Sequence, residues 1–123
     1  MSGWRVLIVE DCLEIATLEA DVVSMTDSDP TIASDGAQAL GSLATSDFDL
    51  VLLDLDLPTL SGQAVLERMF EHPKLRLIPV LIISGTIEGL RKTSQVVNVL
   101  EKPFEVAQLQ NMIRRALAHC PKH

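Results

Sequence analysis

The chain has 123 residues, of which 17 are acidic and 10 are basic, so its formal net charge is -7. This length suits one folded domain, and an apolar content of 47% excludes a disordered or collagen-like chain. The acidic balance argues against direct nucleic-acid binding, which depends on clustered Lys and Arg side chains. We expect a cytoplasmic protein, because no apolar run approaches the ~20 residues that cross a membrane and residues 1–5 lack the pattern of a secretory signal.

Five short apolar runs, rich in branched side chains, predict five strands. In chain order they are Arg5 to Val9, Thr31 to Ala33, Leu50 to Leu53, Val80 to Ile83 and Val96 to Leu100. All but the second run are almost continuously apolar, which is typical of strands buried on both faces of a parallel sheet. The weaker second run is expected at the edge of the sheet.

Between these runs the apolar residues take a helical spacing. One predicted buried stripe consists of Ile15, Leu18, Val22 and Met25, and another of Val106, Leu109, Ile113 and Ala116. The segment between Gly85 and Gln95 has few apolar anchors, so a fourth helix there is expected to be short or irregular. The alternation of strands and helices predicts an α/β fold with a doubly wound parallel sheet and helices on both faces.

Polar side chains follow the predicted strands at their carboxyl ends, where open parallel sheets bind ligands. These side chains belong to Glu10, Asp11, Asp54, Asp56, Ser84 and Lys102. Each carboxylate alone could be a solvated turn residue. Together, carboxylates ~5 Å apart repel each other by about 3 kcal/mol at an effective dielectric of ~20, so a bound divalent cation explains the group better. Oxygen ligands favour Mg²⁺.

Ser84 and Lys102 extend the predicted metal site to a phosphoryl-transfer site. Lys102 would neutralise phosphoryl oxygens, Ser84 would donate a hydrogen bond, and one carboxylate would attack the phosphorus. Asp54 is the best candidate nucleophile because it directly follows a buried strand. The cysteines and histidines form no cluster that could bind a softer metal. We interpret the cysteines as free thiols and all five residues as surface or structural residues. They are Cys12, Cys120, His72, His119 and His123.

Ordered motifs along the chain carry a resemblance to a known family. The motifs are Val9-Glu10-Asp11, Leu53-Asp54-Leu55-Asp56-Leu57-Pro58 with Gly62 downstream, Ile83-Ser84-Gly85, and Glu101-Lys102-Pro103-Phe104. This pattern resembles the receiver domain of two-component response regulators over essentially the whole chain. The resemblance implies a flavodoxin-like sheet in the order 2-1-3-4-5, within a single receiver domain over residues 1–123 that has no effector domain.

The resemblance further implies a phosphorelay role. The domain would take a phosphoryl group from a histidine kinase or a histidine phosphotransfer protein, with Mg²⁺ as cofactor, and would switch contacts with an unknown downstream protein. It would be no enzyme beyond accepting and hydrolysing its own phosphoryl group. Met1 and the short tail at 121–123 are expected to mark a complete chain, and neither nucleic acid nor membrane is an expected partner.

The resemblance assigns roles to the acidic residues. Asp54 is implied to be the phosphoacceptor, and Asp11 and Asp54 are implied to bind Mg²⁺ directly. The backbone carbonyl of Asp56 would complete the protein ligands, and Glu10 would act through a metal-bound water. The carboxylate of Asp56 departs from the usual family pattern, and it leaves the lifetime of the acyl phosphate open.

The resemblance also assigns the phosphoryl contacts and reveals departures near them. Ser84 and Lys102 would contact the phosphoryl group, and the peptide bond between Lys102 and Pro103 is expected to be cis. Val99 stands where the family usually carries a switch Tyr or Phe. Residues 85–101 form a short interval, so the face that commonly serves output and dimerisation is expected to be remodelled.

Two alternatives remain open from the sequence. A small haloacid dehalogenase-type phosphatase would use Asp54 as nucleophile and Asp56 as general acid, but its Asp pair would follow the first strand. A receiver-like binding scaffold would work without phosphorylation, but it would leave Ser84, Lys102 and the carboxylates unexplained.

Overall fold

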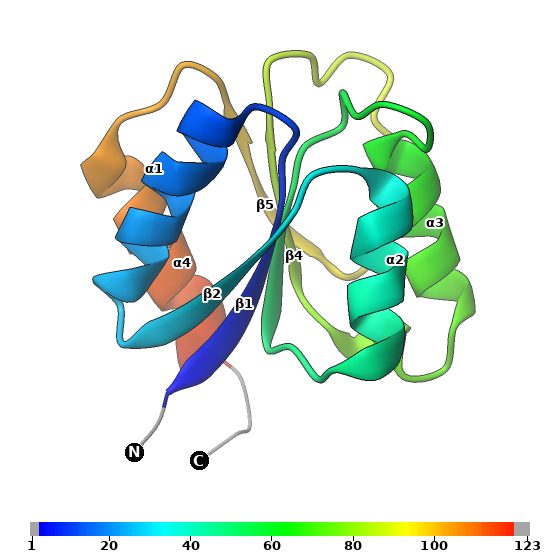
Figure 1. The fold of residues 1–123 in the computed structure, drawn as a ribbon, viewed down its shortest axis with the longest axis horizontal. Helices are drawn as coiled ribbons and strands as arrows, with labels where there is room; N and C mark the ends of the chain where they lie inside the picture. The colour runs from blue at the N-terminus through cyan, green and yellow to red at the C-terminus, as the bar shows by residue number, and fades with distance from the viewer. Residues whose placement is uncertain (1–2, 120–123) are drawn as a thin grey trace.

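A five-stranded parallel sheet forms the centre of the computed structural model, which describes residues 3–119 (Figure 1). Its strands are β1 (Trp4–Val9), β2 (Ser28–Ala33), β3 (Leu50–Leu53), β4 (Val80–Ser84) and β5 (Val96–Glu101). The strand order β2-β1-β3-β4-β5 confirms the predicted flavodoxin-like topology. β1 and β3 lie side by side in the interior of the sheet, with Val9 paired to Leu53 at their carboxyl ends.

Helices cover both faces of this sheet. They are α1 (Leu13–Ser24), α2 (Gly36–Thr45), α3 (Gly62–Glu71) and α4 (Val106–Ala118), and a short 3-10 turn, η1, spans Leu75–Leu77. α1 and α4 cover one face, and α2 and α3 cover the other (Figure 1). The side chains of Asp35 and Ser61 cap α2 and α3 by accepting hydrogen bonds from backbone N–H groups of the first turn. None of the helices described between residues 3 and 119 is long and apolar enough to span a membrane.

The core consists of two apolar layers, one on each side of the sheet. Strand alternation turns Val6 and Ile8 toward α1 and α4, and turns Leu7 and Val9 toward α2 and α3. The central strands are therefore apolar on both faces, as their continuous runs predicted. Their rigidity fixes the positions of the residues that follow them.

The predicted buried stripe of α1 is wrong in its phase. Leu18 and Met25 are 41% and 57% exposed. The buried face of the helix instead consists of Ala16, Glu19, Val22 and Val23. An acidic residue, Glu19, lies within this face and disguises it in the sequence. In α4, three of the four stripe residues are buried as predicted, whereas Val106 is 40% exposed.

β2 is longer than its apolar run indicated. It begins at Ser28 and includes Asp29 and Pro30, which lie before the predicted run of Thr31 to Ala33. The strand is at the edge of the sheet, as predicted, and an edge position tolerates proline because its missing N–H can face outward.

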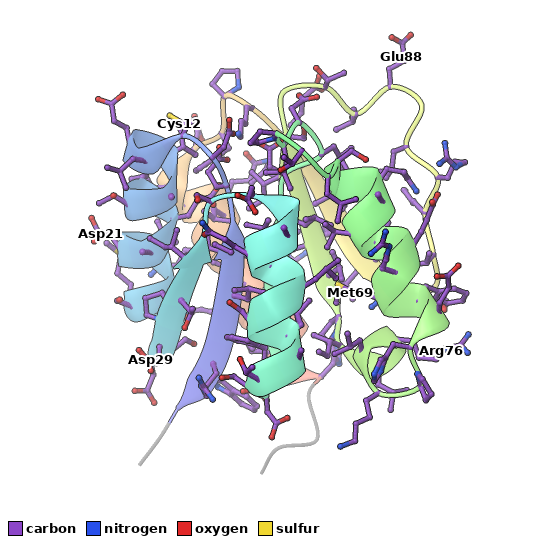
Figure 2. All side chains as sticks on the ribbon, turned by 45° about the vertical axis from the view of Figure 1, so that its right-hand side comes forward. Cys12, Asp21, Asp29, Met69, Arg76 and Glu88 are labelled. Carbon is purple, nitrogen blue, oxygen red and sulfur yellow. The ribbon has the colours of Figure 1, made fainter. Side chains whose placement is uncertain are left out.

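An irregular segment replaces the helix that would connect β4 to β5. Residues 85–95 contain turns and a glycine, Gly89, with φ of 81°. The side-chain amide of Gln63 on α3 accepts from the N–H of Arg91 and donates to its carbonyl, both at 3.0 Å. Arg91 also pairs with Glu67 at 2.7 Å. Figure 2 shows Glu88 of this segment pointing away from the body of the protein. The expectation of a short or irregular fourth helix is confirmed.

Candidate functional site

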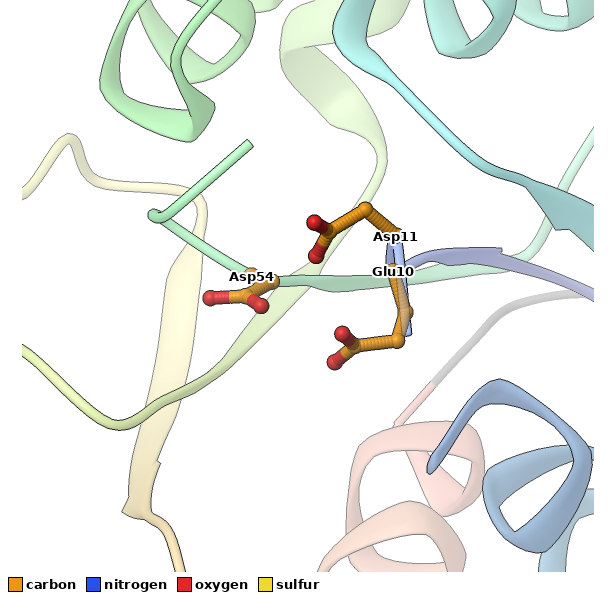
Figure 3. Close-up of side chains that lie close together, drawn as sticks. All are labelled: Glu10, Asp11 and Asp54. Carbon is orange, nitrogen blue, oxygen red and sulfur yellow. The ribbon is translucent and has the colours of Figure 1, made fainter. Parts of the chain in front are cut away.

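Three carboxylates converge where β1 and β3 end. Glu10 and Asp11 directly follow β1, and Asp54 directly follows β3. One carboxylate oxygen from each residue lies within 4.8 Å of the others (Figure 3). The paired register of the two strands produces this convergence, because it brings their carboxyl ends to the same level of the sheet.

The three carboxylates differ in their access to solvent. Glu10 and Asp54 are only 2% and 4% exposed, whereas Asp11 is exposed. The second oxygen of Glu10 accepts a hydrogen bond from the N–H of Cys12 at 3.1 Å. The cluster thus offers oxygen donors alone, with one of them at the surface. This donor set suits a hard dication that enters from solvent.

Lys102 reaches the same cluster from the end of β5. Its Nζ atom donates to Oε1 of Glu10 at 2.6 Å and to Oδ2 of Asp54 at 3.0 Å. Its own N–H donates to the carbonyl of Ser84 at 2.9 Å, which fixes the backbone beside β4. The peptide bond between Lys102 and Pro103 is cis.

The crowding of these charges changes their protonation. Burial raises the pKa of Glu10 above its ordinary value, although hydrogen bonds from Lys102 and Cys12 oppose this rise. Burial alone would lower the pKa of Lys102, but the hydrogen bonds to Glu10 and Asp54 outweigh it and raise that pKa. Lys102 is therefore a permanent cation in the site.

Ser84 is fully buried at the end of β4 and contacts the central carboxylate. Its hydroxyl lies 2.9 Å from Oδ1 of Asp54 and 3.2 Å from the carbonyl of Thr86. The backbone N–H of Asp56 donates to the same Oδ1 atom at 3.0 Å. The carboxylate of Asp56 is exposed and lies outside the converging group. Asp54 is thus held by two neutral donors and one ammonium.

The remaining residues singled out in the sequence lie outside this cluster. Val99 is half-buried and packs against the apolar layer under α2 and α3. Cys12 is a free thiol, and His72 is exposed and accepts from the N–H of Lys74 through Nδ1 at 3.1 Å. His119 is exposed as well. Cys120, His123, Met1 and the tail at 121–123 lie outside the described residues.

Gly62 positions the loop that follows Asp54. A Cβ atom at this position would lie 2.0 Å from the carbonyl oxygen of Asp54 and 2.6 Å from the Cα atom of Leu55. Only glycine allows this approach, and the N–H of Gly62 donates to the Leu55 carbonyl at 3.0 Å. The start of α3 therefore packs directly on the backbone of the central carboxylate.

Glu19 is a buried acidic residue near the site that our sequence reasoning missed. It is 2% exposed on the inner face of α1, and its pKa is raised to about 8 by burial and then by the charge of Glu10. The only signal in the sequence is its spacing from Ala16 and Val23, which places it within one helical face. The predicted stripe that runs from Ile15 to Met25 overlaps this face but does not include Glu19.

Comparison with known proteins connects this arrangement to a family. Residues 6–114 match the response regulator receiver domain family. The chain is 31% identical over 118 residues to the sensor histidine kinase TmoS of Ectopseudomonas mendocina, with 93% of this chain covered. It is 32% identical over 125 residues to the autoinducer 2 sensor kinase/phosphatase LuxQ of Vibrio cholerae, with 97% of this chain covered. The chain spans only 12% and 14% of these two relatives.

A solved structure shows the same architecture. The receiver domain of the sensor histidine kinase PA1611 from Pseudomonas aeruginosa superposes with a TM-score of 0.84 at 26% identity. The match covers 95% of this chain and 99% of that one. The PA1611 structure has a magnesium ion coordinated in its active site cleft.

Proposed function

Because this chain belongs to the response regulator receiver domain family, we propose that it accepts a phosphoryl group on Asp54 with Mg²⁺ as cofactor. A receiver domain is a signalling module of two-component systems rather than a classical enzyme. One observation carries the proposal. Asp54 belongs to a cluster of three carboxylates whose oxygens lie within 4.8 Å of one another, and both Lys102 and Ser84 contact it. A scaffold that works without phosphorylation would not require this set.

The metal role follows from the donor set. Asp11 and Asp54 would bind Mg²⁺ directly, the Asp56 carbonyl would complete the protein ligands, and Glu10 would act through a bound water. Mg²⁺ would supply positive charge against the phosphoryl oxygens. The magnesium ion in the PA1611 receiver domain supports this assignment.

The side chains of this chain can perform the transfer itself. An oxygen of Asp54 attacks the phosphorus of a phosphohistidine, the P–N bond breaks, and its electron pair leaves with the imidazole. The product is an acyl phosphate on Asp54. Lys102 shifts from the carboxylates to a phosphoryl oxygen, and Ser84 redirects its hydroxyl from Asp54 to another. Both groups already lie within hydrogen-bond distance of the acceptor.

The partners follow from this chemistry. The phosphoryl donor would be a histidine kinase or a histidine phosphotransfer protein, consistent with the sensor kinases among its relatives. The output would be a change in contacts with a downstream protein in the cytoplasm. A haloacid dehalogenase-type phosphatase is not proposed, because the matched family is a receiver family.

The proposal is tested by intact mass after incubation with Mg²⁺ and acetyl phosphate. Wild type is expected to gain one phosphoryl group, and Asp54→Asn is expected to gain none. Asp21→Asn, which removes an exposed carboxylate from α1, serves as the matched control and should behave as wild type. An unmodified wild type, or an adduct that persists in Asp54→Asn, would refute the phosphoacceptor role and favour a phosphorylation-independent scaffold.

A further inference from the structure

Glu19 is a buried carboxyl that the proposed transfer does not use. Its side chain is 2% exposed, and its Oε2 atom has no hydrogen-bond partner among residues 3–119. A buried polar group without a partner costs about 1–3 kcal/mol. An apolar residue would stabilise this position better, so stability does not account for Glu19.

The apolar layer around Glu19 leads directly to the acid cluster. β1 turns Val6 and Ile8 toward α1 and α4, and Glu10 continues this alternation at the end of the strand. Glu10 and Asp11 accordingly point to opposite sides of the strand end (Figure 3). Glu19 and Glu10 therefore face the same side of the sheet, one from the helix and one from the strand.

The layer between the sheet, α1 and α4 is built mostly from apolar side chains. α4 contributes the apolar side chains of Leu109 and Ile113, and the β2 residues paired with Val6 and Ile8 are Pro30 and Ile32. The charges that act on Glu19 are those of Glu10, Lys102 and Asp54.

Burial is the largest cause of the raised pKa of Glu19, and the charge of Glu10 raises it further. Its pKa of about 8 leaves the carboxyl mostly neutral at pH 7. With Glu10, Asp11 and Asp54 ionised, the cluster and Lys102 together carry a formal charge of -2. A further negative charge is unfavourable beside this site. When a dication occupies the cluster, that repulsion disappears and ionisation of Glu19 becomes easier.

We propose that Glu19 is a positioning residue for the Lys102 ammonium, and that it gives up its proton when a dication occupies the acid cluster. Lys102 pairs with Glu10 and Asp54 in the structure. Carboxylates engaged with a dication would hold the ammonium less tightly, and an ionised Glu19 on the buried face of α1 would supply part of the lost attraction. The proton passes to solvent, and no covalent bond changes. The inference rests on the proposed function, because it requires the same Mg²⁺ site.

The test counts the protons released when Mg²⁺ saturates the protein at pH 7.5. Calorimetric titration in two buffers with different ionisation enthalpies gives this number directly. Wild type is expected to release on the order of half a proton more than Glu19→Gln. Asp21→Asn is the matched control, because Asp21 is exposed on the same helix and points away from the sheet (Figure 2). It should match wild type.

A second readout follows Lys102 itself. The ¹⁵N shift of its Nζ atom is expected to change more on Mg²⁺ addition in wild type than in Glu19→Gln. Equal proton release and equal shift changes in the two proteins would overturn the inference. If neither protein bound Mg²⁺, the proposed cofactor would be wrong and the inference would fail with it. If both bound Mg²⁺ with equal proton release, only the inference about Glu19 would fail.

A folding defect in Glu19→Gln leaves the test intact. Glu19→Leu, which suits the apolar layer, can then replace it. The Glu19 carboxyl can also be titrated in wild type by ¹³C NMR, with and without Mg²⁺. A lower pKa with Mg²⁺ supports the linkage, and an unchanged pKa refutes it.

Discussion

Thr59 holds a backbone conformation that β-branched residues rarely adopt. Its φ angle is 63° in the loop between β3 and α3. The left-handed region costs an L-residue roughly 1–2 kcal/mol, and Asn tolerates it better than Thr. We expect Thr59→Asn to raise the free energy of unfolding by about 1 kcal/mol, as measured by urea denaturation.

Gly89 provides the reciprocal control. Its φ angle is 81°, and an added Cβ would meet nothing within 4 Å. Gly89→Ala therefore adds left-handed strain without a clash, and it should lower the free energy of unfolding by about 1 kcal/mol. A stabilising Gly89→Ala would show that these angles do not carry the strain we assign to them.

Glu19 predicts a specific dependence of stability on pH. Its folded pKa of about 8 lies above the ordinary value of 4.5, so the folded protein binds this proton more tightly than the unfolded chain does. The resulting stability is fully present below pH 4.5 and is lost as the pH rises through about 8. Between pH 5 and pH 8, wild type should lose on the order of 1 kcal/mol per pH unit from this group.

Substitution of Glu19 should remove this slope. We expect Glu19→Leu to be more stable than wild type at pH 8 and to lose less stability between pH 5 and pH 8, by urea denaturation at several pH values. Asp21→Asn should keep the wild-type slope, because Asp21 is exposed. Parallel profiles for wild type and Glu19→Leu would contradict the buried, neutral carboxyl.

The acid cluster was predictable residue by residue, whereas Glu19 was not. Glu10, Asp11 and Asp54 follow apolar strands, and the ends of parallel strands must meet at one edge. Glu19 lies inside a helix, where burial depends on which face packs on the sheet. The sequence spacing in α1 is compatible with two overlapping faces, and the face that packs on the sheet is the one that contains Glu19.

At the scale of elements, α3 depends on the absence of a side chain at its first residue. The Cβ atom of Gly62→Ala would collide with the carbonyl of Asp54 and the backbone of Leu55. The start of the helix must then move away from the backbone of Asp54 and Leu55. We expect a loss of about 2 kcal/mol in the free energy of unfolding and slower phosphoryl acceptance from acetyl phosphate.

Gly41 is the matched control for this substitution. It is exposed in the middle of α2, and an added Cβ would meet nothing within 4 Å. Gly41→Ala should therefore stabilise the protein by roughly 0.5–1 kcal/mol through helix propensity, with unchanged phosphoryl acceptance. If Gly62→Ala and Gly41→Ala changed stability and phosphoryl acceptance equally, the close approach of α3 to Asp54 would not affect function.

Helices and strands could be predicted from the sequence where a local pattern of apolar residues determines them. Continuous apolar runs predicted the central strands, and the weak pattern between Gly85 and Gln95 predicted a short or irregular helix where the structure has an irregular segment. The path of that segment depends on Gln63 and Glu67 of α3, which bind Arg91 from a distant part of the chain. No local pattern encodes such a contact. The start of β2 was likewise missed because its pairing with β1 outweighs the presence of Pro30.

At the scale of the whole molecule, the acidic charge gathers in the half of the chain that builds the cluster. Residues 1–56 contain twelve of the 17 acidic side chains but only one basic side chain, Arg5. This half includes β1, β3 and α1, so the potential around Glu10, Asp11 and Asp54 is strongly negative. Such a field attracts dications and destabilises the compact state through repulsion among like charges.

A bound dication should therefore stabilise the entire fold. A ligand at 100 times its Kd that binds only the folded state adds about 2.7 kcal/mol, which corresponds to roughly 10 °C in Tm for a domain of this size. We expect Mg²⁺ to produce a shift of this order in calorimetry, and NaCl at equal ionic strength to produce much less. Asp11→Asn should lose most of the Mg²⁺ shift, because it removes the exposed carboxylate of the cluster. Equal shifts from the two salts would mean that diffuse screening, rather than a bound ion, relieves the repulsion.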